Sequence, residues 1–204
     1  MEFNSAHFER AFLDVMIFWM LTTPHEFAHA WVAEKLGDDT PRLEGRVTLN
    51  PLAHVDWLGT VAVPLISSLA TGMFFGWGKA VNTNPAKLRG GYTGLLWVAL
   101  AGPGSNVVFA AVLALIGSYW HGGAEILFRA AYLSLFLALF NLIPIPPLDG
   151  SKFLLAARVP AGIYVEVSRF GFIVLMVLMS RTGLGQWMSA TSATGAIALF
   201  QLFR

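Results

Sequence analysis

Three apolar stretches, at residues 94–120, 124–143 and 162–180, most strongly limit how this chain can fold. Each has the length of about 20 residues or more that a helix needs to cross the hydrocarbon core of a bilayer. Hydrophobic residues make up 56% of the sequence and charged residues only 12%, against about 25% charged in an average soluble domain. Backbone groups inside a bilayer must be satisfied within their own segment, so these stretches are expected to be helices. The sequence therefore predicts a membrane protein.

The remaining apolar segments extend this prediction. Residues 8–36 and 187–203 are expected to form two further helices, and residues 52–77 form an apolar stretch interrupted by Gly, Pro and Ser. The alternation of polar and less polar residues over 42–49 predicts a short strand, and residues 77–81 are a second candidate. We expect an all-α polytopic membrane protein with five to six transmembrane helices, a re-entrant or peripheral segment at 52–77, and short membrane-associated β-strands.

No repeat and no long hydrophilic stretch divides the sequence, so residues 1–204 are expected to form a single domain. A net charge of +1 without a basic stripe argues against a nucleic-acid partner. If residues 52–77 do not cross, most basic residues fall on one side, which the positive-inside rule makes cytoplasmic. That side would carry Lys35, Arg42, Arg46, Lys79, Lys87, Arg89, Lys152, Arg158 and Arg204. A multi-pass protein of a cell membrane is therefore expected.

A His-Glu-x-x-His sequence lies inside the first apolar segment. On a helix, His25 and His29 share one face and can bind the same metal ion, while Glu26 lies beside them. This spacing is typical of hydrolytic zinc sites, in which the Glu deprotonates a metal-bound water. The chain has no Cys, so a metal must rest on His, Asp and Glu. Histidines that merely bond neighbouring helices are the alternative, but three titratable groups are costly in an apolar helix.

A catalytic zinc needs a third protein ligand, and Asp149 is the conspicuous candidate. It follows a segment with three prolines, residues 144–147, which stops the preceding helix. Irregular backbone at membrane depth is tolerated only where protein or a watery cavity surrounds it. The alternative is an interfacial Asp that caps the helix beginning near Ser151.

Four other polar residues have candidate roles. The Asn141 amide, at the helix end before the prolines, could donate to an oxyanion or bind the substrate chain. Asn106 lies inside an apolar span and must have a partner, for which an interhelical hydrogen bond is favoured over substrate contact. His54 and Asp56 could form a second metal or gating site, but interfacial hydrogen bonding is commoner.

Taken together, these motifs resemble the site-2 protease family of intramembrane zinc metalloproteases (peptidase family M50), and most of all its compact prokaryotic members without PDZ and CBS domains. The resemblance implies that His25, His29 and Asp149 bind one Zn²⁺ ion. It also implies that Glu26 activates water and that Asn141 contacts the substrate backbone. A prokaryotic plasma membrane is the location that it implies, and the basic residues place the active site closer to the cytoplasmic face. The matching segments are residues 25–30, 48–54, 75–79, 99–106 and 141–150.

Two positions depart from the family pattern. Relatives tend to carry Pro where this chain has Ala80, and a bulky apolar residue where it has Gly104. Neither is a proposed ligand, so the differences concern substrate positioning rather than chemistry.

The expected function is hydrolysis of peptide bonds within or near a transmembrane segment of another membrane protein, as in regulated intramembrane proteolysis. The partners would be that segment and the lipid bilayer, and the oligomeric state stays open. The edge of the predicted strand at 42–49 could pair with the opened substrate. A zinc transporter or metal sensor with the same ligands is the alternative, and Glu26→Gln separates the two: hydrolysis depends on Glu26, whereas transport need not.

Overall fold

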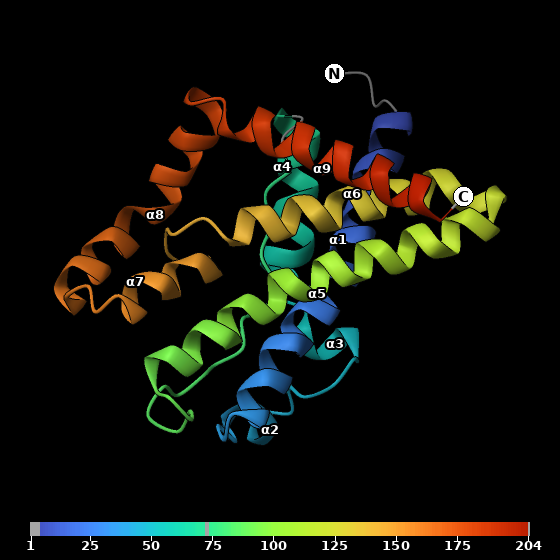
Figure 1. The fold of residues 1–204 in the computed structure, drawn as a ribbon. Helices are drawn as coiled ribbons and strands as arrows, with labels where there is room; N and C mark the ends of the chain where they lie inside the picture. Colours follow the sequence, from blue (N-terminus) through green and yellow to red (C-terminus); the bar gives the residue numbers. More distant parts are fainter. Residues whose placement is uncertain (1–4, 72–73, 204) are drawn as a thin grey trace.

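The computed structural model describes residues 5–71 and 74–203, and within these the regular structure is helical, with no strand. The long helices are α1 (Ser5–Lys35), α5 (Tyr92–Tyr119), α6 (Ala124–Asn141), α8 (Ala161–Arg181) and α9 (Leu184–Leu202), as Figure 1 shows. The short ones are α2 (Thr40–Leu43), α3 (Pro51–His54), the π-helical η1 (Trp57–Ala62), α4 (Val63–Thr71), η2 (His121–Gly123), η3 (Asp149–Ser151) and α7 (Lys152–Ala156).

Three helices are long and apolar enough to cross a membrane: α5, α6 and residues Gly162–Arg181 of α8. They coincide with the three apolar stretches of the sequence and confirm that prediction. The helices α1 and α9 occupy the other two expected positions, but in the described residues only the first three combine sufficient length with sufficient hydropathy. The chain is therefore a largely helical membrane protein.

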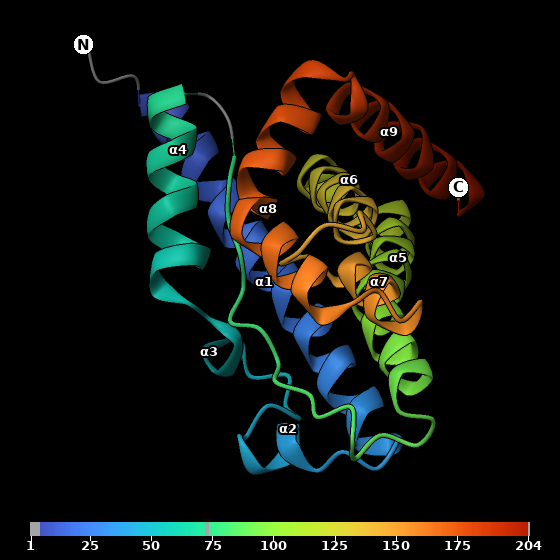
Figure 2. The same cartoon turned by 90° about the vertical axis from the view of Figure 1, so that its left-hand side faces the viewer.

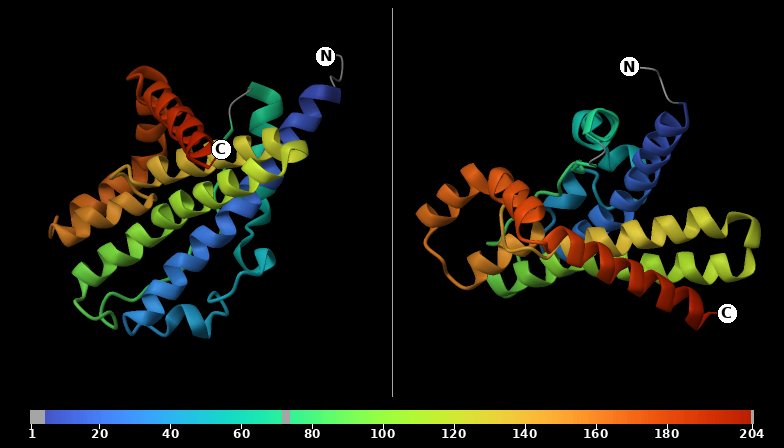
Figure 3. Two further views of the ribbon diagram at one scale, coloured as in Figure 1. Left: turned by 45° about the vertical axis from the view of Figure 1, so that its right-hand side comes forward. Right: turned by 90° about the horizontal axis from the view of Figure 1, so that it is seen from above.

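The centre of the molecule is the packing of α5 against α6 on one side and against α1 on the other, with α9 lying over α6 (Figures 1 and 3). The core they share contains Leu21 of α1, Ala110 and Ala114 of α5, Ala131 of α6 and Phe200 of α9. Small side chains such as these alanines let helix backbones approach closely, which is how helices associate in membranes. This close contact brings the His-Glu-x-x-His face of α1 against α5.

The strand predicted over residues 42–49 is wrong. Pro41 lies in the first turn of the short helix α2, and turns follow it, with Gly45 at a φ of 67°. The Arg46 side chain is buried and donates to two backbone carbonyls, whereas Leu43 and Leu49 are largely exposed. The period-two pattern therefore reflects a buried arginine between exposed leucines, not a strand with an apolar face.

The apolar stretch predicted at residues 52–77 begins in α3, and the chain comes back to α3 at Lys79. After η1 and α4 the chain turns back. Residues 76–83 form an extended segment that runs beside α1 (Figure 2). Its Lys79 N–H donates to the His54 carbonyl at 3.0 Å, and its Trp77 N–H donates to the Gly59 carbonyl at 2.9 Å. The candidate strand at 77–81 is thus extended but has no strand partner among the described residues. Residues 72–73, which follow α4, lie outside the part of the chain that the structure describes.

Candidate metal centre

The helix α1 places His25, Glu26 and His29 in its buried half, toward α5 and the loop before η3. The two histidines are four residues apart and their rings meet edge to face, with centroids 4.7 Å apart. Because both side chains leave the same face of one helix, their spacing is set by the helix itself. The geometry predicted from the His-Glu-x-x-His spacing is present.

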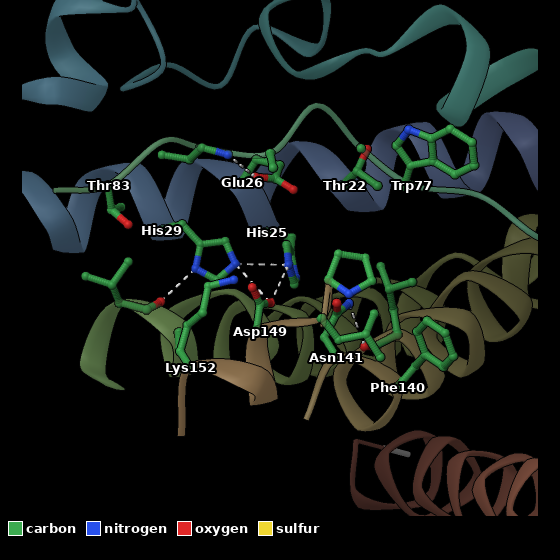
Figure 4. Close-up of a pocket in the computed structure, with 18 of the residues that line it drawn as sticks. Thr22, His25, Glu26, His29, Trp77, Thr83, Phe140, Asn141, Asp149 and Lys152 are labelled. Atoms are coloured by element: carbon green, nitrogen blue, oxygen red, sulfur yellow. Dashed lines mark hydrogen bonds and ion pairs between the residues drawn. The ribbon is translucent and has the colours of Figure 1, made fainter. Parts of the chain in front are cut away.

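Asp149 completes a group of three possible metal ligands. Its Oδ2 lies 3.1 Å from Nε2 of His25 and 3.1 Å from Nε2 of His29, and the two Nε2 atoms are 3.1 Å apart. Figure 4 shows the two rings pointing toward the Asp149 carboxylate. These are the three residues that the sequence predicts as ligands, and the structure brings them together.

This triangle fits a zinc ion. Tetrahedral zinc at about 2.0–2.2 Å from each ligand separates its ligand atoms by about 3.3–3.6 Å, close to the separations found here. Two imidazoles and one carboxylate form a donor set of the type that zinc hydrolases use, with a fourth position left for water. Among the described residues, this is the group of His and carboxylate side chains that satisfies such spacing.

The helix α5 forms the back wall of the site. The His29 Nδ1 lies 2.6 Å from the Val98 carbonyl oxygen, and the His25 Nδ1 lies 3.2 Å from the side-chain amide of Asn106. Gly102 lies between these two positions on the same face of α5, where a Cβ would come within 2.3 Å of the His29 Nε2. A glycine is therefore needed for the two helices to approach closely enough to hold both rings.

Glu26 opens onto a cavity of about 250 Å³ that also contains the three ligand residues. Its Oε2 accepts a hydrogen bond of 3.2 Å from the Val81 N–H of the extended segment. Gly78 of the same segment lies over the other oxygen, where a Cβ would be 3.3 Å from Oε1. The extended segment therefore covers the carboxylate that the sequence predicts as the general base.

Asn141 lines the same cavity, at the end of α6. Its side-chain amide donates to the Leu137 carbonyl at 3.1 Å, one helical turn earlier. The structure therefore places Asn141 beside the ligands without a direct bond to them (Figure 4).

His54 and Asp56 lie apart from this centre. The His54 ring contacts the Thr48 carbonyl through Nε2 at 2.7 Å, and burial lowers the pKa of His54, which favours the neutral ring. Asp56 accepts hydrogen bonds from the first amides of η1 and so caps that helix. Both side chains have structural partners, and neither belongs to a cluster of three ligands in the described part of the chain.

Sequence reasoning missed several parts of the site. Val98 acts through its backbone carbonyl and Val81 through its backbone amide, and neither group has a signature in a sequence. A signal did exist for Gly102, because it lies four residues before Asn106 in a helix, where glycine is costly without a packing reason. The interhelical partner expected for Asn106 is the His25 ring.

The site combines two buried histidines with the Asp149 carboxylate across from them and the Glu26 carboxylate beside them. In a helical membrane protein, this arrangement defines a metal-dependent hydrolase centre. Comparison with known proteins agrees. Residues 118–179 match peptidase family M50. The Bacillus subtilis protein named "Putative zinc metalloprotease YwhC" is 38% identical over 176 residues, which cover 76% of this chain and 74% of that protein.

Two further relatives carry the name "Putative zinc metalloprotease Rip2". The protein from Mycolicibacterium smegmatis is 28% identical over 184 residues, and that from Mycobacterium tuberculosis is 28% identical over 188 residues. Each alignment covers 86% of this chain and 70% of the relative. No solved structure matches the chain significantly.

The chain belongs to peptidase family M50, the site-2 protease family. It is a zinc metalloprotease of that type, and the predicted family, enzyme class and metal are confirmed.

Proposed function

We propose that the protein cuts peptide bonds within or beside transmembrane segments of other membrane proteins, with His25, His29 and Asp149 as the ligands of one zinc ion. The observation that carries this proposal is the convergence of the three ligand atoms between apolar helices. Zinc bound there supplies the acidification of a water molecule and the polarisation of the scissile carbonyl. A centre placed between such helices meets its substrates in the bilayer.

Glu26 acts as the general base in this proposal. The Val81 N–H fixes the position of Oε2, and Oε1 accepts no hydrogen bond from the described residues. Oε1 is therefore available to take the proton from water and to deliver it later to the leaving amine.

Asn141 binds the substrate chain or the developing oxyanion. Its side-chain amide lies in the cavity, and its present partner, the Leu137 carbonyl, belongs to the helix end. An amide N–H that turns from this carbonyl to the substrate would stabilise charge as other oxyanion donors do.

The extended segment offers an edge for the substrate, in place of the strand expected at 42–49. Trp77 and Lys79 bond their backbone groups to η1 and α3. Because successive groups of an extended chain point to opposite sides, those of Gly76 and Gly78 should point away from η1 and α3, toward the cavity that both residues line. They form no hydrogen bond within the described part of the chain, so an unwound substrate segment could pair with them.

For the topology we propose five crossing helices, α1, α5, α6, α8 and α9, and a re-entrant segment formed by η1 and α4. Support comes from the hydrogen bond between the Lys79 N–H and the His54 carbonyl, which joins the parts of the chain before and after that segment. The basic residues between α1 and α5 then lie on one side, with the active site closer to the cytoplasmic face.

Cleavage mapping tests the proposed function. The purified full-length protein and its Glu26→Gln form are incubated in vesicles with a panel of single-span membrane proteins, and products are mapped by mass spectrometry. We expect cuts within or next to the spans with the unaltered protein and none with Glu26→Gln. Cuts confined to soluble domains, or equal products from both forms, would contradict the proposal.

Single cysteines test the topology, because the chain has no Cys of its own. Cysteines at the exposed positions Leu49 and Ala86, on either side of the η1–α4 segment, should react with an impermeant thiol reagent from the cytoplasmic side, and one at Gly122 from the other side. Labelling of Leu49→Cys and Ala86→Cys from opposite sides would show that the segment between them crosses fully.

A further inference from the structure

The side chain of Asn106 touches the proposed metal centre from behind. It is fully buried in α5, and its Nδ2 lies 3.2 Å from the His25 Nδ1. Its Oδ1 has no hydrogen-bond partner in the described part of the chain. The two amide atoms of an Asn are exchanged by rotation of the side chain, and their assignment follows from the surrounding hydrogen bonds.

The proposed ligand set fixes which amide atom must face His25. His25 points its Nε2 at Asp149, so a metal shared by these two residues is bound through Nε2 and leaves a proton on Nδ1. An Nδ1–H facing the Asn106 NH₂ group would set two donors against each other in a buried place, which is costly. With the amide rotated, Oδ1 accepts the hydrogen bond from Nδ1–H.

His29 already has the corresponding partner. Its Nδ1 lies 2.6 Å from the Val98 carbonyl oxygen, which can only accept, so His29 carries its proton on Nδ1 and directs Nε2 at Asp149. Val98 and Asn106 lie eight residues apart on one face of α5, with Gly102 between them. One helix face thus presents an acceptor to each ring.

We propose that Asn106 is a positioning residue for zinc, whose Oδ1 accepts a hydrogen bond from the His25 Nδ1–H and holds this ring with Nε2 directed at the metal. This inference rests on the proposed ligand set of His25, His29 and Asp149. Metal-bound histidines commonly donate their second N–H in this way, and loss of the acceptor typically weakens metal affinity about 10–100-fold.

Zinc affinity of the purified full-length protein, measured by competition with a chelator, tests the proposal. Asn106→Leu should bind zinc about 10–100-fold more weakly, because it offers no acceptor. Asn106→Asp should bind at least as tightly as the unaltered protein, because a carboxylate oxygen accepts the same bond. The matched control is Ser134→Ala, since the Ser134 hydroxyl donates to the Asn106 backbone carbonyl at 2.8 Å and does not contact His25. It should leave the affinity unchanged within about twofold, well below the range expected for a lost acceptor.

The variants separate this inference from the ligand set. His25→Ala should lose tight zinc binding. If it retains that binding, the ligand set and the role of Asn106 both fail. If His25→Ala loses zinc but Asn106→Leu binds as the unaltered protein does, or Asn106→Asp binds as weakly as Asn106→Leu, only the role of Asn106 fails.

A spectroscopic measurement covers the case in which Asn106→Leu does not fold. In the zinc-loaded, ¹⁵N-histidine-labelled protein, both zinc-bound rings should show a protonated Nδ1 and a metal-bound Nε2. A zinc-bound ring with the opposite arrangement would overturn the proposal without any variant.

Discussion

The two halves of the site are built differently. The helical half consists of His25 and His29 on α1 and the face of α5 behind them, and its side chains are buried and bonded to a neighbouring helix. The loop half consists of the extended segment at 76–83 and the proline-rich loop that leads into η3, whose first residue is Asp149 with an 18% exposed side chain. Both halves line one cavity, but long helices hold only the first.

This difference indicates a division of tasks. A helix fixes the spacing of two ligands and cannot change it without breaking its own hydrogen bonds, so the helical half suits metal binding. The loop half covers Glu26 and has backbone groups at the cavity without a partner among the described residues, so it suits substrate entry and pairing. Substitutions in the helical half should therefore change zinc affinity, and those in the extended segment should change cleavage alone.

The largest expected effect comes from Asp149, the proposed ligand of the loop half. Asp149→Ala should lower zinc affinity by about 100-fold or more, beyond the usual effect of losing a supporting residue, and abolish cleavage. Chelator competition measures the affinity. Asp39→Ala is a matched control, because this exposed carboxylate pairs with Lys87 far from the centre. Zinc binding by Asp149→Ala equal to the unaltered protein would remove Asp149 from the ligand set.

Gly102→Ala tests the helical half without removing a ligand. The new Cβ would come within 2.3 Å of the His29 Nε2, and overpacking of this kind costs about 1–3 kcal/mol. Zinc affinity should fall roughly tenfold to a hundredfold, because the ring must move from its ligand position. Gly104→Ala, at a position with no atom within 4 Å of the added Cβ, should bind zinc normally. Equal affinities in the two variants would contradict the close fit of α5 against the rings.

Gly59→Ala tests the extended segment. A Cβ at this position would lie 2.1 Å from the Trp77 Nε1, so the indole must leave its place against η1. We expect kcat/KM for a cleaved membrane substrate to fall about tenfold, with zinc affinity unchanged. A parallel loss of zinc would show that the two halves are not separable in the way proposed here.

The smallest effect is expected from Ala80→Pro, which introduces the proline that relatives tend to carry at this position. The Ala80 N–H donates to no other described residue, so its loss should change cleavage by less than about twofold. Lys79→Pro, one position earlier, removes the hydrogen bond to the His54 carbonyl and should reduce cleavage more strongly. Equal effects of the two prolines on kcat/KM would show that the hydrogen bond between Lys79 and His54 does not hold this segment in place.

The sequence predicted the parts of the molecule that helical periodicity and composition determine. The three apolar spans correspond to α5, α6 and α8, and residues 8–36 to α1. The sequence also predicted the three possible ligands that the structure brings together, His25, His29 and Asp149, because two share a helix face and the third follows a run of prolines.

The rest depends on contacts that no local pattern encodes. Arg46 is buried because it reaches two distant backbone carbonyls, which inverts the pattern that predicted a strand there. The contact between the Val81 amide and Glu26 joins residues 55 positions apart through a backbone group. The role of the extended segment becomes visible only when the return of the chain from α4 is known.

Anomalous scattering at the zinc edge from a crystal of the zinc-loaded, full-length protein tests the central claim most directly. One peak is predicted, within bonding distance of His25 Nε2, His29 Nε2 and an oxygen of Asp149, with the Glu26 carboxylate beside it. A peak bonded to the two histidines but not to Asp149, or a peak at another group of residues such as His54 and Asp56, would contradict the account.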